Sequence, residues 1–245
     1  VEAATLTLDE FILARAGGIP VKVALVFDTS HGADVVMSRP GIRSIEQLAG
    51  QRIGVEETAA GALMLRKALQ AAELNTEDII REPLIGSEHV AAYRSGSVDA
   101  VISYEPYATR LESLGARRLF DSSAFPGLIV DVLAVHEQAI ERQKDALTLL
   151  VDAHFEALGV LKASPGRAYR MMAPRLGLSI AETQQAFEGI ELLGVDDNRA
   201  WLAPPARPLR DAADAVARIM QANALIDTIP ALEGVATARF VPEGP

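Results

Sequence analysis

Apolar and polar positions follow two different periods along the first 135 residues, and the alternation of these periods predicts an α/β fold. Short β-branched and apolar runs, such as residues 21–27 and 98–103, have the length of buried strands. Between such runs, apolar residues recur three or four positions apart, as in residues 59–69, which predicts amphipathic helices. Strands that alternate with helices indicate mixed sheets with helices on both faces.

The pattern changes after residue 136, where it becomes helical. Further helices are expected at residues 144–163, 164–176, 179–188 and 208–222, which gives a helical C-terminal tail over residues 137–245. The expected strands lie at residues 1–6, 21–27, 33–38, 52–55, 79–84, 98–103, 117–120 and 129–135.

Residues 50–69, GQRIGVEETAAGALMLRKAL, combine a strand, a tight turn and the start of a helix. The strand ends at Val55, a polar loop of Glu56, Glu57 and Thr58 follows, and the helical pattern begins with small residues. In open α/β sheets, ligands bind at the carboxyl ends of strands, where helix N-termini present free N–H groups. The stretch therefore predicts a small-molecule site.

Charge and composition narrow the function classes. The chain has 245 residues, a formal net charge of −10 and 49% hydrophobic residues, which is typical of a globular protein. An acidic chain is a poor partner for nucleic acid, so no nucleic-acid binding is expected. The sequence contains no cysteine, which excludes a thiolate nucleophile and a zinc-thiolate site. No apolar run approaches the ~18 residues that span a bilayer.

Three motifs carry a resemblance to a known family. The stretch GQRIGVEETAAGALMLRKAL is followed by GSVDAVISYEPY at residues 96–107 and by PGLIVDVLAV at residues 126–135. Together they resemble the type II periplasmic substrate-binding proteins of ABC importers, within the nitrate/sulfonate/taurine-binding and thiamine-precursor (pyrimidine synthase-like) group. The resemblance covers nearly the whole chain. It implies a periplasmic or extracytoplasmic monomer that binds a small-molecule solute and delivers it to a membrane permease.

The same resemblance implies two lobes with a ligand-binding cleft between them. Residues 1–39 and 131–245 would form the first lobe, and residues 40–130 would form an inserted second lobe. Family members carry about 50 to 60 residues before a segment like the start of this chain, so we expect the first lobe to lack N-terminal strands and to expose sheet edges.

Candidate ligand-binding residues are those that follow the predicted strands or begin the predicted helices. Other roles stay open for several: Asp9 and Thr58 as helix caps, Glu56 and Glu57 as partners of a helix N-terminus, and Asp131 as one half of an ion pair. The candidate residues are Thr7, Asp9, Asp28, Ser30, His31, Glu56, Glu57, Thr58, Ala59, Gly61, Tyr104, Glu105 and Asp131.

The charge of these candidates indicates the class of solute. Besides Asp9, five of them have acidic side chains, and no lysine or arginine occurs at the same strand ends. Unpaired carboxylates that face a buried anion would cost several kcal/mol. We therefore expect a cationic or neutral nitrogen-containing organic molecule, such as an aminopyrimidine or an amine. A sulfonate or nitrate, as in other members of the family, is the alternative ligand.

The motifs of common enzyme classes are missing from the sequence, which has no HExxH, nucleophile elbow or P-loop. We expect no catalytic residue, no metal and no cofactor. Two other functions on the same fold remain as alternatives. One is an enzyme, such as a lyase or dehydratase that uses the strand-end carboxylates. The other is a ligand-sensing domain of a regulator, which would carry a basic helix-turn-helix.

Overall fold

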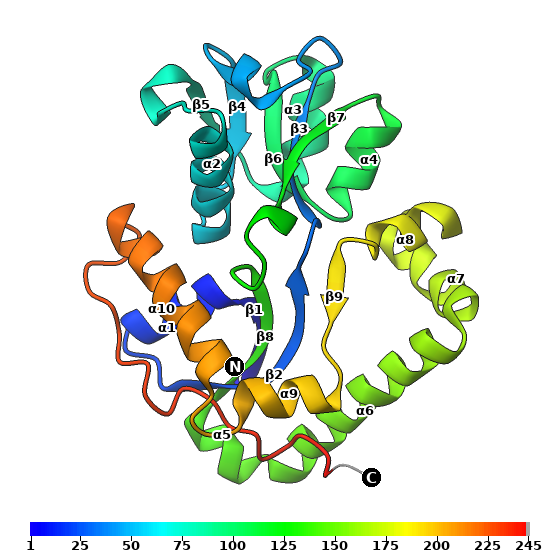
Figure 1. Ribbon diagram of the computed structural model, residues 1–245. Helices are drawn as coiled ribbons and strands as arrows, with labels where there is room; N and C mark the ends of the chain where they lie inside the picture. The colour runs from blue at the N-terminus through cyan, green and yellow to red at the C-terminus, as the bar shows by residue number, and fades with distance from the viewer. Residues whose placement is uncertain (244–245) are drawn as a thin grey trace. The chain divides into compact units, whose positions relative to one another are not determined.

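The computed structural model describes residues 1–243 of the chain, which forms two compact units. Unit 1 comprises Val1–Thr29, Gly127–Met171 and Glu191–Pro245, whose last two residues lie outside the described part. Unit 2 comprises Ser30–Pro126 and Met172–Ile190. Each unit contains one β-sheet with helices packed on it, so the expected α/β class with two sheets is confirmed (Figure 1).

Within residues 1–243, nine strands form the two sheets, and the apolar runs of the sequence predict the first eight. The strands are β1 (Ala3–Thr7), β2 (Val21–Ser30), β3 (Asp34–Ser38), β4 (Arg52–Val55), β5 (Ile80–Pro83), β6 (Ala100–Tyr104), β7 (Arg117–Asp121), β8 (Val130–His136) and β9 (Ile190–Leu192).

Ten α-helices and four 3-10 helices accompany the strands in the described residues. The 3-10 helices are short links in unit 2. The helices are α1 (Leu8–Ala16), α2 (Ala59–Ala71), α3 (His89–Ser95), α4 (Tyr107–Ser113), α5 (Glu137–Arg142), α6 (Lys144–Ala163), α7 (Pro165–Leu176), α8 (Ile180–Ala186), α9 (Val195–Leu202), α10 (Arg207–Ala222), η1 (Ile45–Leu48), η2 (Thr76–Asp78), η3 (Gly86–Glu88) and η4 (Ser122–Ala124).

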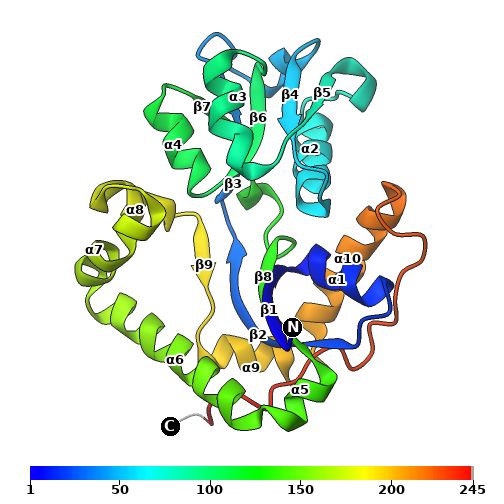
Figure 2. The same ribbon diagram turned by 180° about the vertical axis from the view of Figure 1, so that it is seen from behind.

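The sheet of unit 1 has the strand order β1-β8-β2-β9. Strands β1 and β2 both run antiparallel to β8, so residue 131 of β8 lies opposite Thr7 on one side and Asp28 on the other. Helix α1 packs on β1 and β8, and α10 packs against α1, as the view from behind shows (Figure 2). This register brings three polar strand ends of unit 1 together.

The sheet of unit 2 has the strand order β5-β4-β6-β3-β7. Strand β4 is parallel to both β5 and β6, whereas β3 is antiparallel to β6 and β7. The carboxyl ends of β5, β4 and β6 therefore meet at one edge of this sheet. Gly54 in β4 has no room for a side chain, because a Cβ there would lie 2.5 Å from Leu84 Cδ1.

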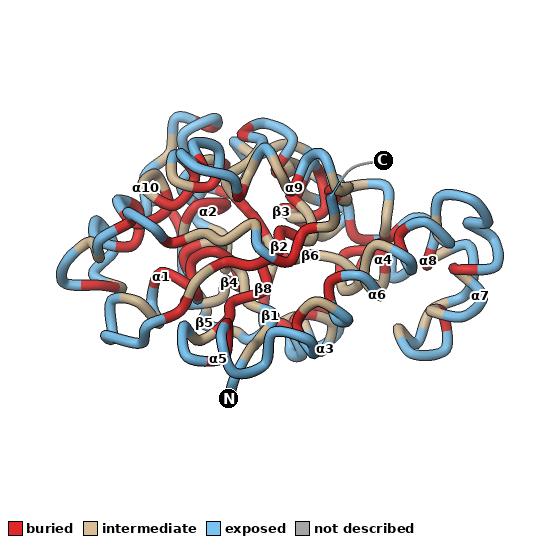
Figure 3. The backbone as a smooth tube through the Cα atoms, turned by 90° about the horizontal axis from the view of Figure 1, so that it is seen from below, coloured by how far each residue is buried: buried red, intermediate tan, exposed pale blue. Residues whose placement is uncertain are grey.

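The apolar cores lie where strands pack against helices, and the buried stretches of the tube in Figure 3 include both kinds of element. In unit 1, residues of β2 and β8 pack with α5, α6 and Phe240 near the end of the described chain. In unit 2, Val35, Met37 and Val101 of the central strands pack with α3 and α4. Among the described residues, no helix combines the length and the apolar character that a membrane crossing requires.

The division into units differs from the expected lobe boundaries at residues 39/40 and 130/131. The break lies at residues 29/30 and 126/127, because β3 pairs with β6 and β7 and therefore belongs wholly to unit 2. Residues 172–190, expected in the first lobe, also belong to unit 2. Their helix α8 packs on α4, and Gln185 Nε2 donates a hydrogen bond of 2.5 Å to Glu112 Oε2.

The expectation of a purely helical tail is wrong at one element. Strand β9 lies within residues 137–245 and joins the edge of the unit 1 sheet next to β2. Directly after β9, Leu193 N donates a hydrogen bond of 3.0 Å to Phe27 O. With only three residues, β9 is too short to show the alternation that predicts a strand. The remaining described elements of the tail are helices, as expected.

Candidate functional site

The candidate site of unit 2 lies at the carboxyl ends of three parallel strands. Glu56 follows β4, Tyr104 ends β6, and Gly86 begins η3 shortly after β5. Because β5, β4 and β6 are neighbours in the sheet, these three residues come together. The contacts of Glu56 with the other two show that they form one group, which we call the Glu56 edge.

The carboxylate of Glu56 is held in place by two hydrogen bonds. Gly86 N donates a short hydrogen bond to Glu56 Oε1, and Tyr104 Oη donates to the same oxygen at 3.3 Å. Both Glu56 and Tyr104 are partly buried, so they remain in reach of solvent. Burial, together with the nearby charge of Glu56, raises the pKa of the Tyr104 phenol, which therefore stays a hydrogen-bond donor at neutral pH.

An aromatic cluster adjoins the Glu56 edge. The rings of His89, Tyr104 and Tyr107 contact one another edge to face, with centroid distances of 5.8 Å from His89 to each tyrosine and 5.5 Å between the tyrosines. His89 is fully buried, whereas both tyrosines are partly buried. Burial lowers the pKa of His89 to about 4, so the imidazole is neutral at pH 7. The cluster offers flat apolar surface beside a carboxylate.

The N-terminus of α2 lies directly after Glu56 in the chain. Thr58 is its N-cap, and its Oγ1 accepts a hydrogen bond of 3.1 Å from Gly61 N. A Cβ on Gly61 would lie 2.5 Å from Glu56 O, so a glycine is needed for this close approach. Glu57 is exposed and Ala59 is buried. The structure therefore gives Thr58 a capping role, while Glu57 points to no described partner.

Glu105 also follows β6, but its carboxylate is engaged within unit 2. Its Oε2 accepts hydrogen bonds from Thr109 N at 3.0 Å and from Thr109 Oγ1 at 2.7 Å. Arg118 forms ion pairs with Glu105 at 3.5 Å and with Glu112 at 3.2 Å. Only 5% of the Glu105 side chain is exposed, and this burial raises its pKa. Glu105 therefore anchors the first turn of α4 and the strand β7.

Ser30 and His31 lie where the chain enters unit 2. The hydroxyls of Ser30 and Ser122 are 2.7 Å apart, and Ser30 Oγ also accepts a hydrogen bond of 3.1 Å from Asp34 N. Both serines are buried, whereas His31 is exposed and its backbone N donates to Gly189 O at 2.9 Å. The polar groups of Ser30 therefore serve the start of β3.

The candidate residues of unit 1 form a second, acidic group. Asp131 lies opposite Thr7 of β1 and Asp28 of β2 in the sheet. Thr7 begins α1: its N donates to Glu10 Oε2 at 3.0 Å, and its Oγ1 donates to Asp9 Oδ1 at 2.5 Å. Asp9 is only 6% exposed. The register thus brings together all four candidate residues of unit 1.

Asp131 is expected to make the stability of unit 1 depend on pH. Burial, and then the negative charges of Asp9 and Glu10, raise the pKa of Asp131 to about 6. An unfolded aspartate titrates near 4, so ionised Asp131 destabilises the fold above about pH 6, and this penalty disappears as the pH falls toward 4. Asp131→Asn should therefore raise the free energy of unfolding at pH 7.5 by about 2 kcal/mol, as measured by urea titration.

The matched control for this prediction is Asp152→Asn, which changes the same chemical group at an exposed position of α6. It should leave the pH dependence of unfolding unchanged. If the difference between wild type and Asp131→Asn is the same at pH 4 and pH 7.5, the raised pKa of Asp131 is refuted.

Sequence reasoning missed four residues in or around the Glu56 edge, and the sequence signal for them was weak or absent. Gly86 and His89 lie in a weak strand-to-helix link, and Tyr107 begins a helix of seven residues. Arg118 belongs to β7, a strand expected from the sequence, but its pairing with Glu105 depends on the order β6-β3-β7. A Gly followed by Ser-Glu-His after a strand end was the available clue to Gly86 and His89.

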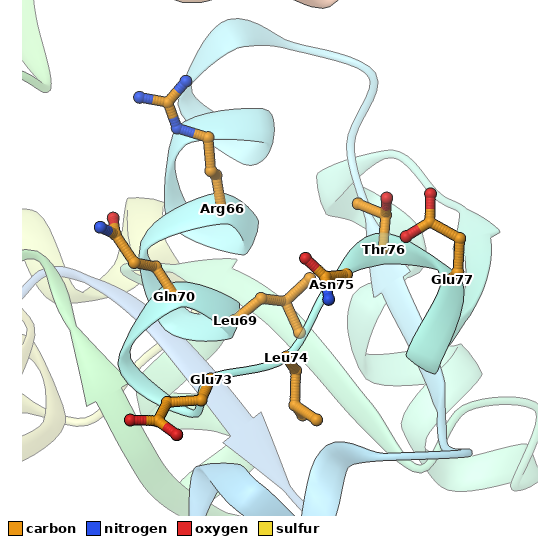
Figure 4. A pocket seen from close by; sticks show the side chains of 8 residues that line it. All are labelled: Arg66, Leu69, Gln70, Glu73, Leu74, Asn75, Thr76 and Glu77. Carbon is orange, nitrogen blue, oxygen red and sulfur yellow. The ribbon is translucent and has the colours of Figure 1, made fainter.

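A hollow elsewhere on unit 2 lies between the C-terminal half of α2 and η2 (Figure 4). None of the thirteen candidate residues lines it, since Thr58 caps the opposite end of α2. Among the described residues, no group of three His, Asp or Glu side chains could hold a metal ion. The lining residues are Arg66, Leu69, Gln70, Glu73, Leu74, Asn75, Thr76 and Glu77.

Comparison with known proteins identifies the family. The family described as NMT1/THI5 like matches residues 2–168, and the chain belongs to it. Proteins of Brucella abortus (strain 2308) and Brucella suis biovar 1, provisionally named as binding proteins, are each 27% identical to it over 133 residues. Each match covers 49% of this chain and 42% of the relative, so the chain spans less than half the length of these relatives.

Solved structures share the fold. The alkanesulfonate-binding protein SsuA from Xanthomonas axonopodis pv. citri, bound to MOPS, has a TM-score of 0.73 and 17% identity, over 94% of this chain and 78% of SsuA. The aliphatic sulphonate binding protein SsuA from Escherichia coli has a TM-score of 0.73 and 18% identity, over 94% of this chain and 77% of that SsuA. The desulfurization enzyme DszB has a TM-score of 0.71 and 21% identity, over 98% of this chain and 84% of DszB. The expected fold of periplasmic binding proteins is thereby confirmed.

Proposed function

We propose that this chain is the solute-binding component of an ABC importer, located outside the cytoplasm, and that it captures a small nitrogen-containing organic molecule. The solute is cationic or neutral, and a membrane permease receives it. Membership of the NMT1/THI5 like family and the names of the Brucella relatives support a binding role. The name of the Escherichia coli SsuA protein, which calls it periplasmic, supports the location. The import function is supported by a structure of the same fold from Staphylococcus aureus, named as the ligand binding component of an ABC-type import system.

The observation that carries the choice of solute is the fixed carboxylate of Glu56. Its two hydrogen bonds converge on Oε1, so a donor group on the solute would meet the carboxylate at Oε2. The neighbouring Tyr104 and Tyr107 rings offer a surface for a flat molecule. An amino group therefore finds a charge-assisted acceptor here, whereas a sulfonate would face a negative charge.

The arginine that pairs with Glu105 does not make the strand ends of unit 2 positive. Arg118 is bound to both Glu105 and Glu112, so its single positive charge is already matched by two carboxylates. The candidate residues of unit 1 are also acidic, with Asp131, Asp28 and Asp9 close together. Each unit, taken by itself, thus presents negative strand ends, and those of unit 2 beside Glu56 favour a cation or a neutral donor as the solute.

Glu56→Gln tests this proposal. The substitution keeps the shape of the side chain and removes its charge, so the affinity for an amine-bearing heterocycle should fall by about tenfold to a hundredfold, the value of a charge-assisted hydrogen bond. The affinity for a sulfonate should stay the same or rise. Isothermal titration calorimetry with 4-aminopyrimidine and with MOPS measures both.

The matched control is Glu77→Gln, which removes one carboxylate from η2 at the far end of α2. Glu77 is exposed, so this variant should bind both compounds as the wild type does. The choice of solute would be refuted if the wild type bound MOPS tightly and did not bind 4-aminopyrimidine, and if neither variant weakened the binding of MOPS. The proposed import function would not be affected by this outcome.

A sulfonate or a similar oxyanion is the second candidate solute. It is favoured by the N-cap of α2, where Thr58 and the first turn of a thirteen-residue helix lie next to Glu56. The two SsuA proteins bind sulfonates according to their names. An enzyme is the third candidate, since DszB shares the fold, and turnover of a bound solute would distinguish it from a binding protein.

A further inference from the structure

Helix α6 has two apolar faces, of which only one packs on the rest of unit 1. Leu147, Val151 and Leu158 lie on the inner face and are buried. A second set of apolar side chains recurs at intervals of three or four positions, which places it on the opposite face of the helix. This outer stripe consists of Ala146, Leu149, Leu150, Ala153, Ala157 and Val160, all of them exposed.

The outer stripe is unusual for a helix at the surface of a globular protein, which ordinarily turns charged side chains to solvent. The exposed fraction is 70% for Leu149, 49% for Leu150 and 37% for Val160. A single exposed apolar residue is ordinary, but a contiguous row marks an interaction surface. With a rise of 1.5 Å per residue, the row from Ala146 to Val160 is about 21 Å long. It contains only alanine, leucine and valine, so it offers no polar group to a charged partner.

We propose that the outer stripe of α6 is the contact surface of a symmetric dimer, in which the α6 helices of two copies pack antiparallel about Ala153. In this register, positions equally far from Ala153 in the two directions face each other. Leu149 of one copy then meets Ala157 of the second copy, and Val160 meets Ala146. Large side chains therefore lie opposite small ones, and the two alanines at the two-fold axis allow the helices to approach closely.

This match of large to small side chains is the reason to choose a second copy as the partner. In a parallel pair, Leu149 would meet Leu149 and Ala157 would meet Ala157, which leaves gaps at the alanines. The antiparallel pair fills the same gaps with the stripe's own leucine and valine side chains. The dimer goes beyond the proposed function, because the whole stripe lies in unit 1 and none of its residues is a candidate ligand-binding residue.

The size and the charge of the contact determine its expected strength. One pair of helices is a small interface compared with the roughly 800 Å² per partner of a stable complex, so we expect a dissociation constant of about 10 µM. Each chain has a net charge of −10, and the exposed Asp152 and Glu156 flank the stripe, so charge opposes association. The monomer that the family resemblance implies would then be the main species only below this concentration.

Sedimentation velocity tests the dimer. Wild type should change from mostly monomer at about 1 µM to mostly dimer at about 200 µM, and added NaCl should strengthen the association by screening the repulsion. Leu149→Glu places a charge in the apolar contact, so it should raise the dissociation constant about tenfold or more. Leu13→Glu is the matched control, because Leu13 is 52% exposed on α1, outside the stripe. It should associate as wild type does.

Single cysteines test the antiparallel register, since the chain contains no cysteine of its own. Ala153→Cys places two thiols at the two-fold axis, where mild oxidation by diamide should link them in a covalent dimer. Ala146→Cys places the thiols about 21 Å apart along the helices, so it should remain unlinked on a non-reducing gel. Equal crosslinking of both variants would show a parallel pair and overturn the proposed register.

Two further outcomes would overturn the dimer itself. One is a wild type that stays monomeric at about 200 µM, and the other is a dimer that Leu149→Glu leaves intact. Vesicles of neutral phosphatidylcholine provide the comparison with a lipid surface. If wild type bound them without self-association and Leu149→Glu did not bind them, the outer stripe would belong to a lipid surface and the dimer would be refuted.

Discussion

Asn198→Leu is expected to lower the free energy of unfolding of unit 1 by about 3 kcal/mol or more, because it leaves two buried backbone groups of β2 unpaired. Asn198 is fully buried on α9. Its Oδ1 accepts from Val26 N at 2.8 Å, and its Nδ2 donates to Val26 O at 3.0 Å. Leucine fills a similar volume but cannot replace either bond.

The position of Asn198 explains why so much depends on one amide. Strand β2 has a register shift against β8 between Val26 and Asp28, so its pairing is irregular at this point. The side chain of Asn198 there takes the place of a neighbouring strand. It also donates to Gly194 O at 3.1 Å, so the same amide fixes the start of α9. The loss is therefore larger than that of an ordinary surface hydrogen bond.

Trp201 provides the measurement, since it is the single tryptophan of the chain and lies on α9 close to Asn198. Urea unfolding followed by its fluorescence reports on unit 1. Asn223→Ala serves as the control, because Asn223 is exposed and donates one hydrogen bond to Ile219 O at the end of α10. It should cost about 1 kcal/mol or less. An Asn198→Leu midpoint within error of wild type would show that β2 does not depend on this amide.

Hydrophobic periodicity predicted most of the fold, because long or strongly apolar elements carry a clear period. The strand at residues 52–55 and the helix at residues 144–163 have the expected bounds. Strand β9 was missed because three residues are too few to show a period. The assignment of β3 to unit 2 depends on its pairing with β6 and β7, which no local pattern encodes.

The candidate site was predictable only as far as strand ends could be located. Glu56 and Tyr104 were expected because each follows or ends an apolar run, and the structure brings them within hydrogen-bond distance. Gly86 and His89 were missed because their importance arises from the parallel pairing of β5 with β4, which places a weakly patterned link beside Glu56. The roles of all these residues in binding remain predictions that the experiments above test.

Gly86→Ala is expected to have the largest effect on solute binding, with a loss of affinity of about a hundredfold. A Cβ at this position would lie 2.1 Å from Tyr104 Oη and 3.1 Å from Glu56 Oε1. The tyrosine ring is packed against His89 and Tyr107, so it cannot retreat without disturbing the whole cluster. The single methyl group would therefore displace Tyr104 and change the position of the Glu56 carboxylate, while the fold of unit 2 persists.

A double-mutant cycle with Tyr104→Phe separates this mechanism from general destabilisation. Tyr104→Phe removes the oxygen that the new methyl group would strike, so Gly86→Ala should cost much less affinity in that background than in wild type. Gly41→Ala is the control, because a Cβ there meets no atom within 4 Å. Calorimetry with 4-aminopyrimidine measures each variant. Additive losses would mean that Gly86 does not act through Tyr104, because only a shared contact between the two residues makes their effects on binding interdependent.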